Sequence, residues 1–102
     1  MRVLYSETIN VDKDVHLECL QWMQKVHIPQ MLATGLFEEN RILRLVNEEQ
    51  NTGVTYSLQF VLKNRSDLAE YQNVYETQFR SALYNKYTNK LVDFVTILEL
   101  IE

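Results

Sequence analysis

The spacing of the apolar residues switches back and forth along this chain between the two-residue repeat of a β-strand and the 3.6-residue repeat of an α-helix. Residues 2–11 alternate, residues 12–28 repeat at helical spacing, residues 54–62 alternate again, and a second helical repeat leads to an apolar segment at 91–101. Only two glycines and one proline occur in 102 residues, so few positions interrupt regular structure. The chain therefore has to build a domain of interleaved strands and helices.

The first helix is predicted for residues 12–28, directly after a strand over residues 2–11. Asp12 offers an N-cap. Its predicted apolar face comprises Val15, Cys19, Trp22, Met23 and Val26. Pro29 cannot continue the backbone hydrogen bonds, so we expect a bend at residues 27–29, a short extension over 29–34 and a stop at Gly35.

The second half of the chain predicts a hairpin, a second helix and a last strand. The hairpin joins residues 36–49 to 54–62 through a turn at 50–53. Ser66 and Asp67 are the predicted caps of a helix that runs to about Tyr87. The final strand is predicted over residues 91–101.

The resulting order, βαββαβ, is that of the ferredoxin-like α+β fold. Two right-handed crossovers place both helices on one face of a four-stranded antiparallel sheet in the order 4-1-3-2. We expect residues 1–102 to form one such domain. The alternating apolar residues of the third strand should face the helices; they are Val54, Tyr56, Leu58, Phe60 and Leu62.

The other face of this sheet is too apolar to stay in water. It carries Leu4, Val61 and, depending on the orientation of the last strand, either Val95, Ile97 and Ile101 or Phe94, Leu98 and Leu100. A second copy of the chain could cover such a face. The sequence therefore predicts a homodimer that forms through the outer face of the sheet.

Charge and motifs exclude several function classes. A net charge of −4 disfavours nucleic-acid binding, and Val54 stands where an RNA-recognition module carries its first stacking aromatic residue. No apolar run approaches the roughly 18 residues of a membrane span. Cys19 lies on the apolar face of the predicted first helix, so we expect its thiol to be buried and inert. Because an unpaired thiol suits a reducing compartment, we also expect a cytoplasmic protein. No motif for a nucleotide, a metal or another cofactor is present, and none is expected.

His27 is the strongest functional candidate, because it precedes the predicted bend and lies at the edge of the apolar face. His16 lies near it on the helical wheel but roughly 16 Å away along the helix, which is too far for a shared metal ion. Each histidine could equally be a boundary residue that packs its ring and forms one hydrogen bond. We expect the His27 ring to turn inward.

Glu7 is a weaker candidate for acid–base chemistry. Its position in the alternation points the carboxyl group toward the helices, where burial is costly unless the group is paired. A bulge or a place near the rim would instead turn Glu7 to water. In the inward orientation, Glu7 would lie near Tyr5, Tyr56 and His27.

The segment Trp22-Met23-Gln24-Lys25-Val26-His27-Ile28-Pro29, continued by Leu32-Ala33-Thr34-Gly35 and Phe37, resembles a small bacterial family called domain of unknown function 4286. The likeness extends to residues 10–12, 53–59 and 98–101. It implies a dimeric α+β-barrel, in which two sheets pack face to face, and it implies no activity.

More distantly, Trp22, His27, Pro29 and Gly35 are similar to a pattern in dimeric α+β-barrel groups related to ring-degrading enzymes and monooxygenases. Those enzymes hold an apolar substrate between the helices and the sheet. The haem-degrading branch has its characteristic histidine on the second helix, where this chain has none, so haem is not expected.

Two functions are consistent with these observations. One is a non-catalytic homodimer that binds a ligand or a partner. The other is a cofactor-free, monooxygenase-like enzyme for a small apolar substrate, bound between the first helix and the sheet. His27 would be its polar anchor or base and outranks Glu7, because a neutral imidazole with a pKa of about 6.5 accepts a proton at pH 7. The expected pocket walls are Trp22, Tyr5, Tyr56 and Phe60.

Overall fold

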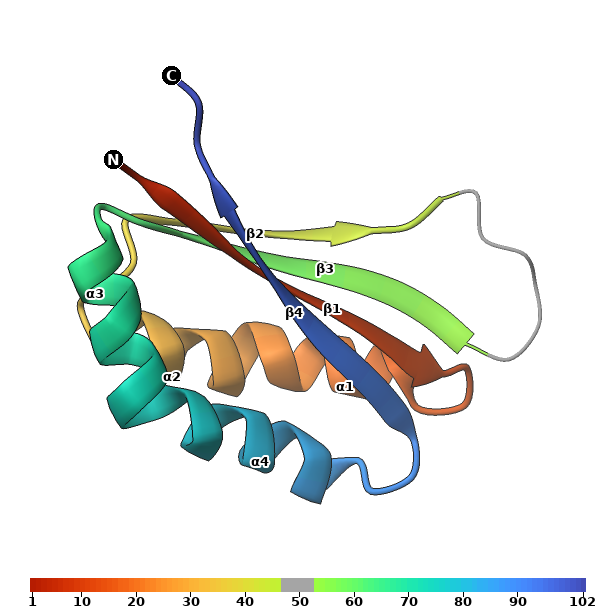
Figure 1. Cartoon of the computed structure of the whole chain (residues 1–102). Helices are drawn as coiled ribbons and strands as arrows, with labels where there is room; N and C mark the ends of the chain where they lie inside the picture. Colours follow the sequence, from red (N-terminus) through yellow and green to blue (C-terminus); the bar gives the residue numbers. More distant parts are fainter. Residues whose placement is uncertain (47–52) are drawn as a thin grey trace.

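The computed structural model describes residues 1–46 and 53–102 of the chain. The strands are β1 (Val3–Asp12), β2 (Glu39–Arg44), β3 (Gly53–Leu62) and β4 (Leu91–Glu99). The first helical segment consists of α1 (His16–Trp22), a π-helical turn η1 (Met23–His27) and α2 (Ile28–Leu32). The second consists of α3 (Arg65–Glu70), a π-helical turn η2 (Tyr71–Tyr75) and α4 (Glu76–Lys86). The element order is the predicted βαββαβ (Figure 1).

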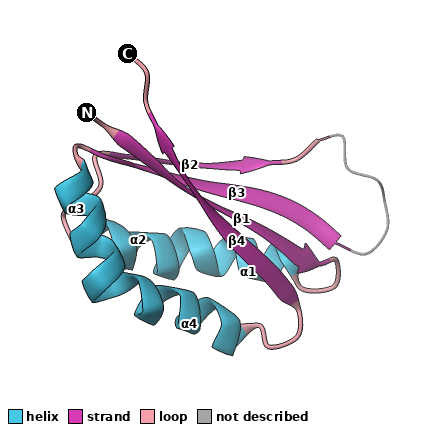
Figure 2. Cartoon of the chain, viewed as in Figure 1, coloured by secondary structure: helices cyan, strands magenta, loops and turns pink. Residues whose placement is uncertain are grey.

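The four strands form one antiparallel sheet in the order β2-β3-β1-β4. This is the predicted order, 4-1-3-2, in the opposite direction. Both helical segments lie on the same side of the sheet, so none of the described helices covers its other face (Figure 2). The structure therefore confirms the ferredoxin-like fold.

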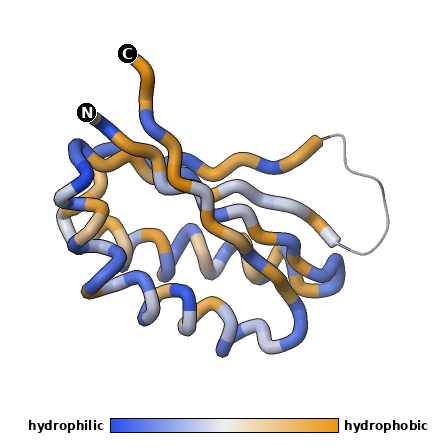
Figure 3. Tube along the Cα trace, viewed as in Figure 1, coloured by the Kyte–Doolittle hydropathy of each residue, from blue (hydrophilic) through white to orange (hydrophobic). Residues whose placement is uncertain are grey.

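Strand pairing assigns each residue to a face, because residues directly opposite in an antiparallel pair share a face. The apolar residues of β3 are buried beneath the helices, as predicted. Tyr5 pairs with Ile97 and Val11 pairs with Leu91, so the odd-numbered residues of β4 face the helices. Phe94 and Leu98 consequently belong to the outer face. Figure 3 shows hydrophobic stretches along β1, β2 and β4, separated by short hydrophilic ones.

The start of the first helix differs from the prediction. Asp12 is the last residue of β1 rather than a helix N-cap, and its backbone N–H donates to the carbonyl of Lys90 at 2.8 Å. Helix α1 begins at His16, after Val15, and its N-cap position makes no side-chain hydrogen bond. Pairing with the chain that leads into β4 holds Asp12 in the sheet, so the predicted cap was wrong.

A π-helical turn changes which residues of the first helical segment face the core. Ile28 N–H donates to the carbonyl of Met23, five residues earlier, so the turn holds one residue more than an α-turn. The predicted core position Val26 is therefore 39% exposed, whereas His27 is 1% exposed. His27 ends η1 and Pro29 lies in the first turn of α2, so the helix type changes at the predicted position, and the bend itself stays a prediction. Gly35 follows α2 with φ of 79°.

The N-cap of the second helical segment lies two residues before the first of the predicted caps. Asn64 is the N-cap, and its side-chain oxygen accepts the N–H of Asp67 at 2.8 Å. Ser66 and Asp67 lie inside the first turn, so their predicted role was wrong. Strand β2 does not include residues 36–38 and 45–46 of the predicted 36–49, whose residues 47–49 lie outside the described residues, and β4 ends before residue 101. Residues 50–52 of the predicted hairpin turn lie outside the described residues.

Candidate functional site

His27 is packed among aromatic rings on the inner side of the first helical segment. Its ring stacks on Trp22 with centroids 4.8 Å apart, and Phe79 meets it edge-on at 5.9 Å. Within the described residues, Nδ1 of His27 has no hydrogen-bond partner. Burial lowers the pKa of His27 to about 4. The inward orientation is therefore confirmed, and the ring is neutral at pH 7.

The other predicted pocket residues pack in two further places. Tyr5 and Phe60 are both fully buried, with ring centroids 6.4 Å apart. Tyr56 lies instead beside His16, whose Nδ1 is 2.9 Å from the Tyr56 hydroxyl. The five residues predicted to line one pocket thus lie in three separate places in the structure. Their joint role in ligand binding remains a prediction.

Two further aromatic residues connect these contacts into a continuous row. Phe79, which meets His27, stacks parallel to Tyr71 with centroids 6.4 Å apart. Tyr71 in turn meets the edge of Tyr5 at 5.1 Å. The space between the two helical segments and the sheet is therefore filled by aromatic side chains along this row.

Glu7 points toward the helices from an unbroken β1 and is 2% exposed. Its side chain is within hydrogen-bond reach of Asp93. No N–H or O–H group of the described residues reaches Oε2 of Glu7. Burial, and next the contact with Asp93, raise the pKa of Glu7 to about 9. Glu7 therefore carries a proton at pH 7, and that proton allows the two carboxyl groups to lie together.

Asp93 is the ionised member of this pair. Nε and Nη2 of Arg80 each donate to its carboxylate at 3.1 Å, and the Tyr84 hydroxyl donates to Oδ1. Burial alone would raise the pKa of Asp93, but hydrogen bonds with Glu7, Arg80 and Tyr84 outweigh it and lower the pKa. Glu7, Asp93, Arg80 and Tyr84 are called the carboxyl centre below.

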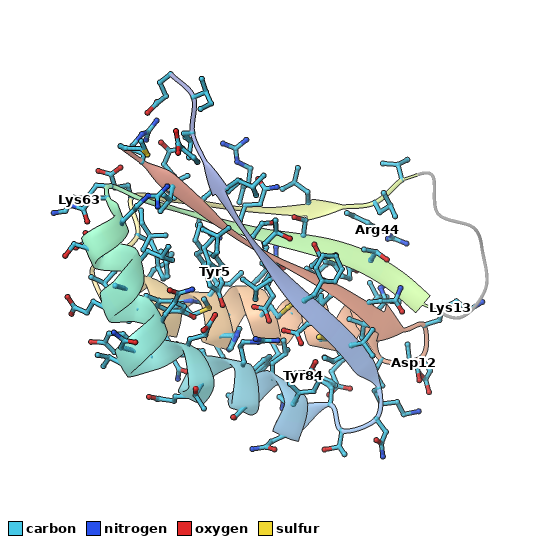
Figure 4. The ribbon with its side chains drawn as sticks, viewed as in Figure 1. Tyr5, Asp12, Lys13, Arg44, Lys63 and Tyr84 are labelled. Carbon is cyan, nitrogen blue, oxygen red and sulfur yellow. The ribbon has the colours of Figure 1, made fainter. Side chains whose placement is uncertain are left out.

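The carboxyl centre connects the sheet to α4. Glu7 and Asp93 come from the neighbouring strands β1 and β4, whereas Arg80 and Tyr84 reach them from the helix; Figure 4 shows Tyr84 between α4 and β4. A hollow of about 220 Å³ lies directly outside, lined by Glu76, Thr77, Arg80, Ser81 and Tyr84. Arg80 and Tyr84 line the hollow, and both also hydrogen-bond to the buried carboxylate of Asp93.

Glu76 extends the polar network toward the aromatic row. The Tyr5 hydroxyl donates to its carboxylate at 2.7 Å. Burial, and next this hydrogen bond, raise the pKa of Tyr5 far above its ordinary value of 10. Tyr5 is therefore a neutral hydrogen-bond donor at neutral pH.

A larger cavity of about 460 Å³ lies at the other end of β4, beside α3. Its apolar walls are Val3, Leu68 and Ile97, and Arg65 and Glu99 line it as charged groups. Nη2 of Arg65 is 3.4 Å from Oε1 of Glu99. Ile97 belongs to the helix-facing side of the sheet but is 40% exposed, so the helical layer leaves this end of the sheet uncovered.

The outer face of the sheet combines exposed apolar side chains at its edges with small polar ones in the middle. Val92, Phe94 and Leu98 of β4 are 67%, 59% and 45% exposed, and Leu43 of β2 is also exposed. The polar side chains of the two central strands hydrogen-bond to one another; these contacts join Ser6 to Ser57, Asn10 to Thr55 and Gln59 to Ser57. These polar side chains therefore have hydrogen-bond partners within the chain.

Sequence reasoning found Glu7 but missed its partners. Asp93 is an acidic residue between apolar residues of a strand, with the same parity as Leu91, Val95 and Ile97, and that position was the available signal. Arg80 gave no signal, because an arginine on a helix is ordinarily solvated. No described group of three histidine, cysteine, aspartate or glutamate residues could hold a metal ion. Among the described residues, no helix is long and apolar enough to cross a membrane.

The element order and strand order place the chain among proteins with the ferredoxin-like α+β fold. The chain belongs to the family described as "Domain of unknown function (DUF4286)", whose sequence profile matches residues 2–101. No curated protein matches the chain.

Solved structures with the same fold are distant in sequence. A variant of SnoaB, a cofactor-independent oxygenase from Streptomyces nogalater, has a TM-score of 0.73 at 9% identity, over 99% of this chain and 94% of that one. A dimeric ferredoxin-like protein from an uncultured marine organism has a TM-score of 0.68 at 12% identity, over 99% and 97%. The de novo designed protein Foldit4 has a TM-score of 0.62 at 7% identity, over 99% and 100%. At these identities the likeness shows the fold alone.

Proposed function

We propose that the protein is a homodimer that binds a small apolar molecule in the cavity between α3 and β4. The observation that carries this proposal is the cavity itself, with about 460 Å³ bounded by Val3, Leu68 and Ile97. Binding sites for small molecules are typically concave, mostly apolar and about 300 to 1,000 Å³ in volume. A molecule the size of a fused pair of aromatic rings fits these dimensions.

The charged pair beside the cavity suits the polar end of such a ligand. Arg65 and Glu99 provide donors and acceptors next to apolar walls, and a few polar groups of this kind orient a ligand in its site. Binding would also cover Ile97, which the chain leaves 40% exposed. We therefore expect a mostly apolar ligand with one hydrogen-bonding group.

The composition of the outer sheet face supports the homodimer. Exposed Phe94, Val92 and Leu98 would be removed from water, and the central polar side chains already have partners within the chain. Two such faces can pack together without burying an unpaired charge on the central strands. A solved neighbour of similar fold is itself described as dimeric.

Ligand binding is tested by titrating the protein with indole and naphthalene and following backbone amide signals by NMR. We expect shifts concentrated at Val3, Leu68 and Ile97. Ile97→Trp fills the cavity and should abolish them, whereas Val74→Trp, at an exposed apolar site on η2, should leave them unchanged. Absence of shifts with both probes, or equal shifts in Ile97→Trp, would contradict the proposal.

Assembly is tested by sedimentation at micromolar concentration. The native chain should sediment at about twice its monomer mass of 12.1 kDa. Phe94→Glu places a charge on the outer face and should produce monomers, whereas Val74→Glu places the same charge on the helical side and should leave the dimer intact. A native mass near 12.1 kDa would refute the homodimer.

A further inference from the structure

We propose that a pocket between the two helical segments binds an uncharged, flat heterocycle whose edge carries an amide group, such as a purine base. This pocket, called the interhelical pocket below, has a volume of about 390 Å³. It is lined by Gln30, Ala33, Thr34, Tyr75, Gln78 and Phe79. It shares no residue with the cavity between α3 and β4, so the two proposals succeed or fail independently.

The interhelical pocket reaches down to the aromatic row between the helices and the sheet. Phe79 lines the pocket although the residue is only 6% exposed, and the same ring contacts His27 and Tyr71. On the opposite wall, Ala33 follows α2 and has a one-carbon side chain, which fills little of the space. The volume lies within the range of about 300 to 1,000 Å³ that is usual for small-molecule sites.

The aromatic rings of the pocket favour a flat ligand. The half-buried Tyr75 ring lies 6.2 Å from that of Phe79, with the two planes 23° apart. Tyr75 is also nearly parallel to Tyr71, at 6.3 Å and 24°. Offset stacking of this kind is a preferred arrangement of aromatic rings, and a heterocycle can extend it. We therefore expect the ligand to stack against Tyr75 and Phe79.

Two carboxamides face the pocket from opposite helices. Gln30 comes from α2 and Gln78 from α4, and both are exposed. No group of the described residues hydrogen-bonds to either side chain, so both are available to a ligand. The Thr34 hydroxyl is already engaged, since it donates to the carbonyl of Met31 at 2.8 Å and accepts the N–H of Leu36 at 3.3 Å. The glutamines are therefore the groups that recognise the ligand.

The chemistry of a carboxamide defines the matching group on the ligand. A glutamine side chain presents an N–H donor beside a carbonyl acceptor. A cyclic amide presents the complementary pair along one edge, and glutamine reads the edge of a purine in this two-bond manner in protein–DNA complexes. An edge with both a donor and an acceptor is thus preferred over an edge with acceptors alone.

The absence of charge in the pocket lining selects against an ionic ligand. All six lining residues are uncharged, whereas a phosphate or carboxylate group is usually held by arginine or lysine. Both helical segments lie on one side of the sheet (Figure 2), so a homodimer formed through the outer sheet face leaves the pocket open to solvent. The inferred ligand is therefore a free heterocyclic base, bound equally well by monomer and dimer.

The test compares two purines by titration of the full chain, followed through backbone amide signals by NMR. Hypoxanthine carries a ring N–H beside a carbonyl group. Caffeine keeps the flat purine ring and its carbonyl groups, but every ring N–H is methylated. We expect saturable shifts at Gln30, Ala33 and Gln78, with hypoxanthine bound at least about fivefold more tightly than caffeine, the effect of about one hydrogen bond.

Variants test the pocket itself. Ala33→Trp fills the space and should abolish the shifts, whereas Ala69→Trp, at an exposed position of α3, should leave them unchanged. Gln78→Leu removes one carboxamide and should weaken hypoxanthine binding about fivefold, while Gln72→Leu, at an exposed position of η2, should retain the native affinity. Circular dichroism confirms that each variant is folded.

Four results would overturn the proposal. They are no saturable shifts with hypoxanthine, equal affinity for hypoxanthine and caffeine, native shifts in a folded Ala33→Trp, and native affinity in a folded Gln78→Leu. Hypoxanthine shifts at Val3, Leu68 and Ile97 in place of the pocket residues would also overturn it. None of these results bears on binding of indole or naphthalene beside α3.

Discussion

Replacement of Glu7 by glutamine should make the protein more stable at neutral pH, although it removes half of a buried polar pair. The unfolded chain releases the Glu7 proton near the ordinary pKa of 4.5, whereas the folded protein holds it up to a pKa of about 9. Between these two values the folded state binds more protons than the unfolded state. The stability that Glu7 contributes is therefore complete below pH 4.5 and is lost as the pH rises toward 9.

The expected magnitude follows from this window. A proton held only by the folded state changes the free energy of unfolding by about 1.4 kcal/mol per pH unit. Glutamine cannot ionise, so the variant lacks this slope. The free energy of unfolding of Glu7→Gln minus that of the native protein should rise by about 3 kcal/mol between pH 5.5 and 8.

Urea unfolding at several pH values and one fixed protein concentration measures this difference. A fixed concentration is necessary because the proposed homodimer would gain stability by mass action. Glu70→Gln serves as the matched control, and its curve should run parallel to the native one. Parallel curves for native protein and Glu7→Gln would refute the reasoning, because they would mean that Glu7 is ionised in the folded state.

Three further predictions concern single residues. Asp93→Ala should lower the free energy of unfolding by about 1 to 3 kcal/mol in urea at pH 7, because Arg80, whose side chain is 35% exposed, loses two hydrogen bonds to a buried carboxylate. A cost below about 0.5 kcal/mol would show that water replaces the carboxylate. His27→Phe should remove a loss of stability between pH 6.5 and 4, because burial lowers the pKa of His27 to about 4 and the unfolded chain therefore takes up the proton first on acidification. Glu7 acts in the opposite direction in native protein and variant alike, so the measured quantity is the thermal stability of the variant minus that of the native protein, which should rise as the pH falls through this window. Asn64→Ala should cost about 1 kcal/mol in urea through loss of the N-cap, and Asn64→Ser should retain most of it.

Element order and strand faces were predictable because they depend on local periodicity. The alternation at residues 54–62 identifies the inner face of β3, and the order of strands and helices leaves few topologies. The π-helical turns were not predictable in this way. The spacing of Met23 and Ile28 is compatible with several registers, and the choice of His27 over Val26 for the core depends on packing against Phe79.

The carboxyl centre shows the same division. The parity of Glu7 predicted either an inward carboxyl group or one near the rim, and local sequence could not choose between them. Its partner Asp93 is 86 residues away, and the contact depends on the pairing register of β1 with β4. The low pKa of His27 likewise depends on the layers that bury it, whereas the sequence supplied only the ordinary value.

The π-helical turn at Met23–His27 also makes the first helical segment tolerant of a change in length. A π-turn is equivalent to an α-helix with one inserted residue, so deletion of a single residue there can restore regular α-helical geometry. Val26 is exposed, and its removal would leave Ile28 one α-turn beyond Met23, on the same side of the helix. Relatives that are one residue shorter in this segment could therefore keep the same core, and an alignment that spreads the gap over neighbouring positions would misplace the histidine.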